Sequence, residues 1–72
     1  MNKELRAVVD KIKLYDAPLG DYVEEVVNKP DRTGISFVLG LVTGLSEQQV
    51  LKTEDRETVQ KFFNDSVDKD SI

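Results

Sequence analysis

The most apolar part of the chain reads DRTGISFVLGLVTGL, from Asp31 to Leu45. Many of its large apolar side chains recur at the spacing of one helical face, namely Ile35, Val38, Leu39, Val42 and Leu45. Phe37 and Leu41 fall on the other side of such a helix, which would therefore be apolar nearly all round. Asp31 is a suitable N-cap residue. These features predict a helix over about residues 32–43, either buried in the domain or used as an interface.

The alternative interpretation of the same residues is a β-strand. Large apolar side chains also stand at every second position, as on one face of a strand: Ile35, Phe37, Leu39 and Leu41. No other part of the chain shows this alternation, so a strand here would have no partner within the chain. We therefore predict a helix.

Two segments before this stretch also have helical spacing. Residues 3–15 follow a suitable N-cap, Asn2, and carry the apolar stripe Leu5, Val8, Val9 and Ile12, which Tyr15 would extend. Pro18 disfavours helical geometry in the residue before it, so the first helix ends near residue 15. A second helix is predicted over about residues 19–28, with the apolar stripe Leu19, Tyr22, Val23, Val26 and Val27.

Two further helices are predicted after the central stretch. Ser46 and Gln49 have the spacing of a capping box, which favours a short helix over residues 46–52. A last helix is predicted from about residue 54 to residue 63 or a little beyond. Its inward-facing residues are Val59, Phe62 and Phe63, and Val67 is the apolar position that would extend this face.

The predicted fold is therefore all-α. We expect a compact bundle of four to five short helices around a central apolar helix, residues 32–43. Residues 1–63 would form a single helical domain, and residues 64–72 an acidic C-terminal tail that frays.

The composition argues against catalysis. The 72 residues include no His, no Cys and no Trp, and 10 basic residues stand against 14 acidic ones, a net charge of −4. These absences exclude imidazole bases, cysteine nucleophiles, disulfides and Cys/His zinc sites. The adjacent Glu24 and Glu25 would point about 100° apart on a helix, so they cannot act as a catalytic pair. We expect no enzymatic activity, no cofactor, no metal site and no small-molecule substrate.

The size and hydropathy of the chain suit a cytoplasmic protein that has a partner. No stretch approaches the roughly 20 apolar residues of a membrane span, and the charged N-terminal segment does not resemble a signal peptide. A domain of this length buries only about 60% of the surface of its unfolded chain, so a partner subunit would add useful stability.

The glycines of the central stretch suggest close packing. A glycine inside a helix costs about 1 kcal/mol relative to alanine, a cost that is tolerated where two backbones approach each other. We therefore expect Gly40 to lie at a crowded helix crossing. Gly44 is expected just beyond the end of its helix, in the left-handed conformation that glycine adopts easily.

The same glycines have the spacing of a known DNA-binding motif. Gly44 follows Gly40 by four positions and precedes Val50 by six, with Leu45 and Ser46 directly after it. In this respect residues 39–54 resemble the helix-turn-helix of phage-repressor-type transcription regulators. The resemblance implies that residues 46–52 form a recognition helix in the major groove. The residues that it would direct towards DNA are Ser46, Gln48, Gln49 and Lys52.

The apolar surplus of the central helix favours a different function, that of a small non-catalytic binding module acting as a regulator or inhibitor. Its candidate interface residues are Phe37, Val38, Leu41 and Val42. We expect the partner to be another protein or a second copy of the chain, and no membrane. The net negative charge disfavours nucleic acid, because DNA affinity depends on basic residues that neutralise phosphates. The DNA-binding regulator remains the alternative.

Overall fold

Four helices make up the fold of residues 1–70. The computed structural model describes the backbone of residues 1–70 and the side chains of residues 1–65. The helices are α1 (Lys3–Tyr15), α2 (Ala17–Asn28), α3 (Arg32–Glu47) and α4 (Thr53–Asp70). Residues 1–70 contain no strand, which confirms the all-α prediction and the choice of a helix for the central stretch. None of the helices within this range has the length and apolar character that a bilayer crossing requires.

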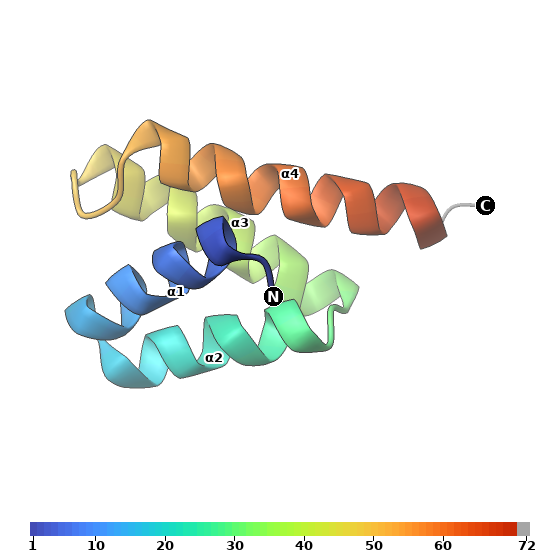
Figure 1. The fold of residues 1–72 in the computed structure, drawn as a ribbon, viewed down its shortest axis with the longest axis horizontal. Helices are drawn as coiled ribbons and strands as arrows, with labels where there is room; N and C mark the ends of the chain where they lie inside the picture. Colours follow the sequence, from blue (N-terminus) through green and yellow to red (C-terminus); the bar gives the residue numbers. More distant parts are fainter. Residues whose placement is uncertain (71–72) are drawn as a thin grey trace.

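Consecutive helices run in opposite directions, and each packs against two others (Figure 1). The pairs in contact are α1 with α2, α2 with α3, α3 with α4, and α4 with α1. The first connection is a single residue, Asp16, whose backbone N–H donates to the end of α1 and whose carboxylate accepts from the N–H of Leu19 at 3.1 Å. One residue therefore ends α1 and caps α2.

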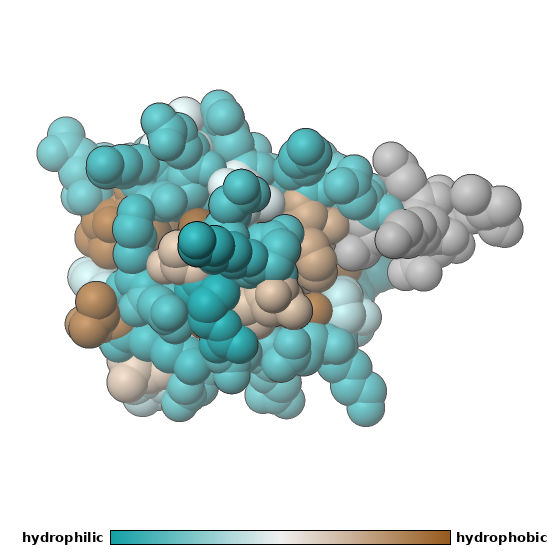
Figure 2. Space-filling model, in the orientation of Figure 1, coloured by the Kyte–Doolittle hydropathy of each residue, from teal (hydrophilic) through white to brown (hydrophobic). Residues whose placement is uncertain are grey.

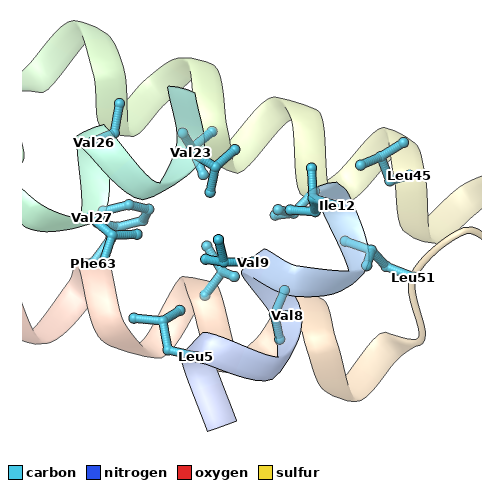
Figure 3. Close-up of a cluster of buried hydrophobic side chains, with 13 residues drawn as sticks. Leu5, Val8, Val9, Ile12, Val23, Val26, Val27, Leu45, Leu51 and Phe63 are labelled. Atoms are coloured by element: carbon cyan, nitrogen blue, oxygen red, sulfur yellow. The ribbon is translucent and has the colours of Figure 1, made fainter. Parts of the chain in front are cut away.

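The core lies between the four helices and is entirely apolar (Figure 3). Its buried members are Leu5, Val8, Val9, Ile12, Val23, Val26, Val27, Val38, Val42, Leu45, Leu51, Val59 and Phe63. No polar or charged side chain of residues 1–65 is buried among them. The helical stripes of α1 and α2 predicted from the sequence point inward, apart from the exposed Tyr15 and Tyr22, because these spacings place each stripe on one face.

The predicted separate helix over residues 46–52 is wrong. Instead, α3 continues through Gly44 to Glu47, and residues 48–52 form the connection to α4. The backbone N–H of Val50 donates to Leu45 O at 2.9 Å, and that of Gln49 donates to Ser46 O at 3.1 Å. This is the bonding pattern of a Schellman helix end. Gln49, with φ 64°, takes the left-handed conformation that was expected at Gly44.

The last helix is longer than predicted. The sequence indicates an end near residue 63, but α4 continues as helical backbone to Asp70. Residues 64–70 of the predicted tail therefore continue α4. Residues 71–72 and the side chain of Val67 lie outside the described part of the chain.

The prediction that Gly40 lies at a crowded helix crossing is also wrong. The glycines with close neighbours are Gly20 and Gly34. A Cβ on Gly40 or Gly44 would meet no atom within 4 Å. A Cβ on Gly20, in contrast, would collide with Lys13 Cγ and lie 2.7 Å from the backbone N and Cα atoms of Lys13. Because Lys13 belongs to α1, Gly20 is the residue that allows α1 and α2 to cross closely.

Ion pairs join α1 to its two neighbours. Lys11 Nζ lies 2.8 Å from Asp55 Oδ2 on α4. Glu24 on α2 accepts hydrogen bonds from Arg6 at 2.6 Å and from Lys13 at 2.9 Å. These bonds, first that from Lys13, lower the pKa of Glu24. Partial burial alone would raise the pKa of Asp55, but the bonds from Lys11 and from the backbone N–H of Lys52 outweigh it and lower the pKa.

These ion pairs predict a loss of stability in acid. A carboxyl whose pKa is lowered by folding stabilises the native state above its unfolded-state pKa, and this contribution is lost as the pH falls through the folded-state value. The ordinary values are 4.5 for Glu24 and 3.8 for Asp55. We therefore expect the free energy of unfolding, measured with urea, to fall between neutral pH and a pH of about 3.

Two amide variants test whether Glu24 and Asp55 cause this loss of stability in acid. The loss should be smaller in Asp55→Asn and in Glu24→Gln, because an amide does not titrate. If both variants lose as much stability in acid as the parent protein, other groups cause the acid sensitivity.

Candidate protein-binding surface

Among the side chains of residues 1–65, large apolar ones are exposed at two places besides the N-terminal Met1. Leu14 and Tyr15 stand at the end of α1, where Leu14 is 90% exposed. Tyr22 on α2 and Phe37 on α3 are 39% and 50% exposed. The face of the molecule that carries α1 is mostly hydrophilic, with hydrophobic colour at the left edge and in smaller patches across the middle (Figure 2). In this orientation α3 lies behind α1 (Figure 1).

Tyr22 and Phe37 form an aromatic pair across the junction of α2 and α3. Their ring centroids lie 5.2 Å apart and their planes are perpendicular, at 90°. This edge-to-face geometry is a favourable one for aromatic rings. Neither ring belongs to the apolar core or to the partly buried side chains that pack against it. The two rings therefore pack against each other, while both side chains remain about half exposed to solvent.

A shallow groove adjoins this pair. The aromatic groove, about 390 Å³ in volume, is lined by Asp16, Pro18, Leu19, Tyr22 and Phe37. A second hollow of about 320 Å³ is lined by Tyr22, Glu25, Val26, Lys29, Pro30 and Asp31. Tyr22 lines both depressions, and the two together are here called the α2–α3 surface.

The outer side of α3 that borders this surface is neutral and flat. No charged residue occurs from Thr33 to Ser46. Gly40 is exposed, and neither it nor Gly44 has a neighbour that a Cβ would meet. The ring of Phe37 therefore projects beside Gly40, where α3 has no side chain, while Leu41 is half-buried against the core.

Acidic side chains surround the α2–α3 surface. Asp16, Glu25 and Asp31 contribute to its lining, whereas Lys29 is the only basic residue there among the described side chains. Asp16 and Asp31 each accept a backbone N–H as helix caps, and both residues are exposed. Asp21, which lies on α2, has a side chain that is 72% exposed, and its Oδ1 atom is 3.7 Å from Lys13 Nζ.

The candidate interface predicted from the sequence is partly wrong. Phe37 is exposed, and Leu41 is half-buried against the core, so both reach the outer side of α3. Val38 and Val42, however, have no exposed surface. The spacing of Gly34, Val38, Val42 and Leu45 places these residues on one face, and α2 and α4 cover that face. An interface cannot use side chains that the core already buries.

The sequence analysis missed Tyr22 as a surface residue. Tyr22 fits the apolar stripe of α2, and that spacing predicts an inward-facing side chain, but the ring is 39% exposed. Tyr22 lies one residue before the fully buried Val23, so it stands at the edge of the stripe. The hydroxyl of tyrosine was the available indication of such an edge position, because a buried tyrosine usually needs a hydrogen-bond partner.

The residues expected to face DNA do not lie on a recognition helix. Ser46 is half-buried in the last turn of α3, while Gln48, Gln49 and Lys52 are exposed in the connection to α4. Only Lys52 among them is basic, and Glu47 and Glu54 flank the segment. The arrangement that the helix-turn-helix resemblance implies for residues 46–52 is therefore not formed.

No metal-binding cluster is found among the side chains of residues 1–65, where no three acidic, histidine or cysteine side chains converge. Comparison of the chain with protein-family models, with curated proteins and with solved structures finds no match.

Proposed function

We propose that this protein is a small, non-catalytic helical binding module that acts by contacting another protein through the α2–α3 surface. The observation that carries the proposal is the half-exposed aromatic pair, Tyr22 and Phe37, at the edge of an apolar groove. Tyrosine and phenylalanine are enriched in protein interfaces, and tyrosine is common among the residues that dominate binding energy. A module of this kind serves as a regulator or inhibitor by covering a site on its partner.

The energetics support this use of the surface. Fully burying a large apolar side chain contributes about 1.5–3 kcal/mol, so half-exposed rings retain part of that energy for a partner. The two rings are held against each other before binding, which reduces the conformational entropy that a partner would have to offset. The flat side of α3 lets another backbone approach Phe37 closely, because Gly40 has no side chain.

The proposal is tested by removing the ring of Phe37. We expect Phe37→Ser to keep the fold, checked by circular dichroism, because the core does not include this side chain. In affinity capture from the source cells, proteins retained by the parent chain should be lost with Phe37→Ser. The matched control is Leu14→Ser, which removes an even more exposed apolar side chain outside the α2–α3 surface. Identical capture by all three chains would refute the proposal.

A further inference from the structure

We propose that the occupant of the α2–α3 surface is a basic amphipathic helix with two large apolar side chains seven residues apart. This inference rests on the proposed function and specifies the chemistry of the partner. It follows from the charge around the surface and from the distance between its two depressions.

The charge of the surface selects a basic partner. The lining residues carry three carboxylates, on Asp16, Glu25 and Asp31, against the single ammonium of Lys29. Throughout Ala17–Asn28 the helix α2 has acidic residues and no basic one. Opposite charges across an interface steer association and exclude partners of the wrong sign. Lysine or arginine side chains on either side of an apolar stripe would meet these carboxylates.

The same charges disfavour a second copy of this chain. In a two-fold dimer through this surface, each acidic patch would face its own copy. The whole chain has a net charge of −4, so like charges would also repel over longer distances. A basic segment has neither disadvantage.

Among the carboxylates, Glu25 is the most available. Asp16 and Asp31 already accept hydrogen bonds from the N–H groups of Leu19 and Gly34. Glu24, the neighbour of Glu25, is occupied by Arg6 and Lys13. Within the described part of the chain, Glu25 makes no ion pair and no side-chain hydrogen bond, and it is exposed.

The spacing of the depressions fits a helix. The aromatic groove contains Leu19, and the second hollow contains Val26, seven residues further along α2. At 1.5 Å per residue this separation is about 10.5 Å. A partner helix lying along α2 presents side chains i and i+7 on one face at the same separation. One would enter the groove beside Phe37 and the other the hollow beside Pro30, with Tyr22 packed between them.

The test uses two synthetic helical peptides of about 18 residues. Both carry leucine at positions i and i+7, with lysine flanking the leucines in one and glutamate in the other. Fluorescence anisotropy measures the affinity of each, and amide chemical shifts of the labelled protein locate the binding. We expect the lysine peptide to bind at least about tenfold more tightly than the glutamate peptide, with the largest shifts at Leu19, Tyr22 and Phe37. Raising NaCl from about 0.05 M to 0.5 M should narrow this difference by screening.

Charge reversal locates the preference on α2. Glu25→Lys should weaken binding of the lysine peptide by about fivefold to tenfold. The matched control Asp10→Lys should change it by less than about twofold, because Asp10 is an exposed carboxylate on α1 that lines neither depression. Equal effects of the two reversals would show that net charge alone attracts the peptide and would overturn the inference.

The failure of this inference differs from failure of the proposed function. Equal binding of both peptides, or a dimer in light scattering that Phe37→Ser dissociates, would reject the basic helix as occupant. The α2–α3 surface would still be an interface in either case. If neither peptide binds and Phe37→Ser captures the same proteins as the parent chain, both proposals fail.

Discussion

Replacing Phe63 with alanine is expected to remove a large part of the free energy of unfolding. Phe63 is the largest fully buried side chain among residues 1–65. A phenylalanine-to-alanine change in a core costs about 3–5 kcal/mol, from the lost apolar transfer energy and the cavity that remains. The free energy of unfolding is usually about 0.05–0.15 kcal/mol per residue, so a chain of 72 residues has about 4–11 kcal/mol in total. The substitution therefore removes a large part of the stability, or all of it.

Urea unfolding followed by circular dichroism measures this loss, and Phe37→Ala provides the control. Both changes delete the same ring, but Phe37 is half-exposed and lies outside the core. We expect Phe37→Ala to cost less than about 1.5 kcal/mol. A Phe63→Ala protein that stays folded with a similarly small loss would contradict the packing of α4 against the other helices.

The sequence predicts helices best where local chemistry sets both ends. For α1 the predicted range, residues 3–15, is the observed one. Asn2 Oδ1 accepts the N–H of Leu5 at 2.7 Å, and Asp16 and Pro18 begin the next helix directly. Here the cap, the apolar stripe and the break agree, so local sequence signals are sufficient to predict the whole helix.

The end of α3 shows why other boundaries could not be predicted. Gly44 and Ser46 have the composition of a turn followed by a cap, and a glycine usually takes the left-handed position at a helix end. In the fold, the buried side chains of Leu45 and Leu51 hold the chain on the core on either side of residues 48–50. The helix continues until Leu45 is packed, and the left-handed position then falls on Gln49. Tertiary burial thus outweighs local turn preference.

The candidate surface was predictable only in part for a related reason. A helix that is apolar nearly all round cannot bury every apolar side chain in one core, so some of them remain at the surface. Phe37 is such a side chain. Which side is covered depends on how α3 is rotated against α2 and α4, and the sequence of α3 does not contain that rotation. Val38 and Val42 were therefore assigned to the interface although they lie in the core. The groove beside Tyr22 arises only where α2 and α3 meet.

Alanine substitutions at Gly20 and Gly40 are expected to have opposite effects on stability. A helical glycine is about 1 kcal/mol less favourable than alanine, so Gly40→Ala, with open space around its Cβ, should raise the free energy of unfolding by about that amount. Gly20→Ala has the same intrinsic gain. Its Cβ would, however, lie 2.7 Å from backbone atoms of Lys13, which can move only if α1 and α2 separate. Overpacking of this kind typically costs about 1–3 kcal/mol.

Comparing the two variants isolates the helix crossing from helix propensity. Because the chemical change is identical, the intrinsic gain cancels in the difference between their urea midpoints, provided that the slopes are equal. That difference should correspond to about 1–3 kcal/mol in favour of Gly40→Ala. Gly44→Ala, a second helical glycine whose Cβ meets open space, should resemble Gly40→Ala. Should Gly20→Ala be as stable as these two variants, the close crossing of α1 and α2 at Lys13 does not exist. If Gly40→Ala instead lowers the free energy of unfolding, another part of the protein or a second copy packs against α3 at Gly40 in solution. The side of α3 beside Phe37 is then not free to bind a partner.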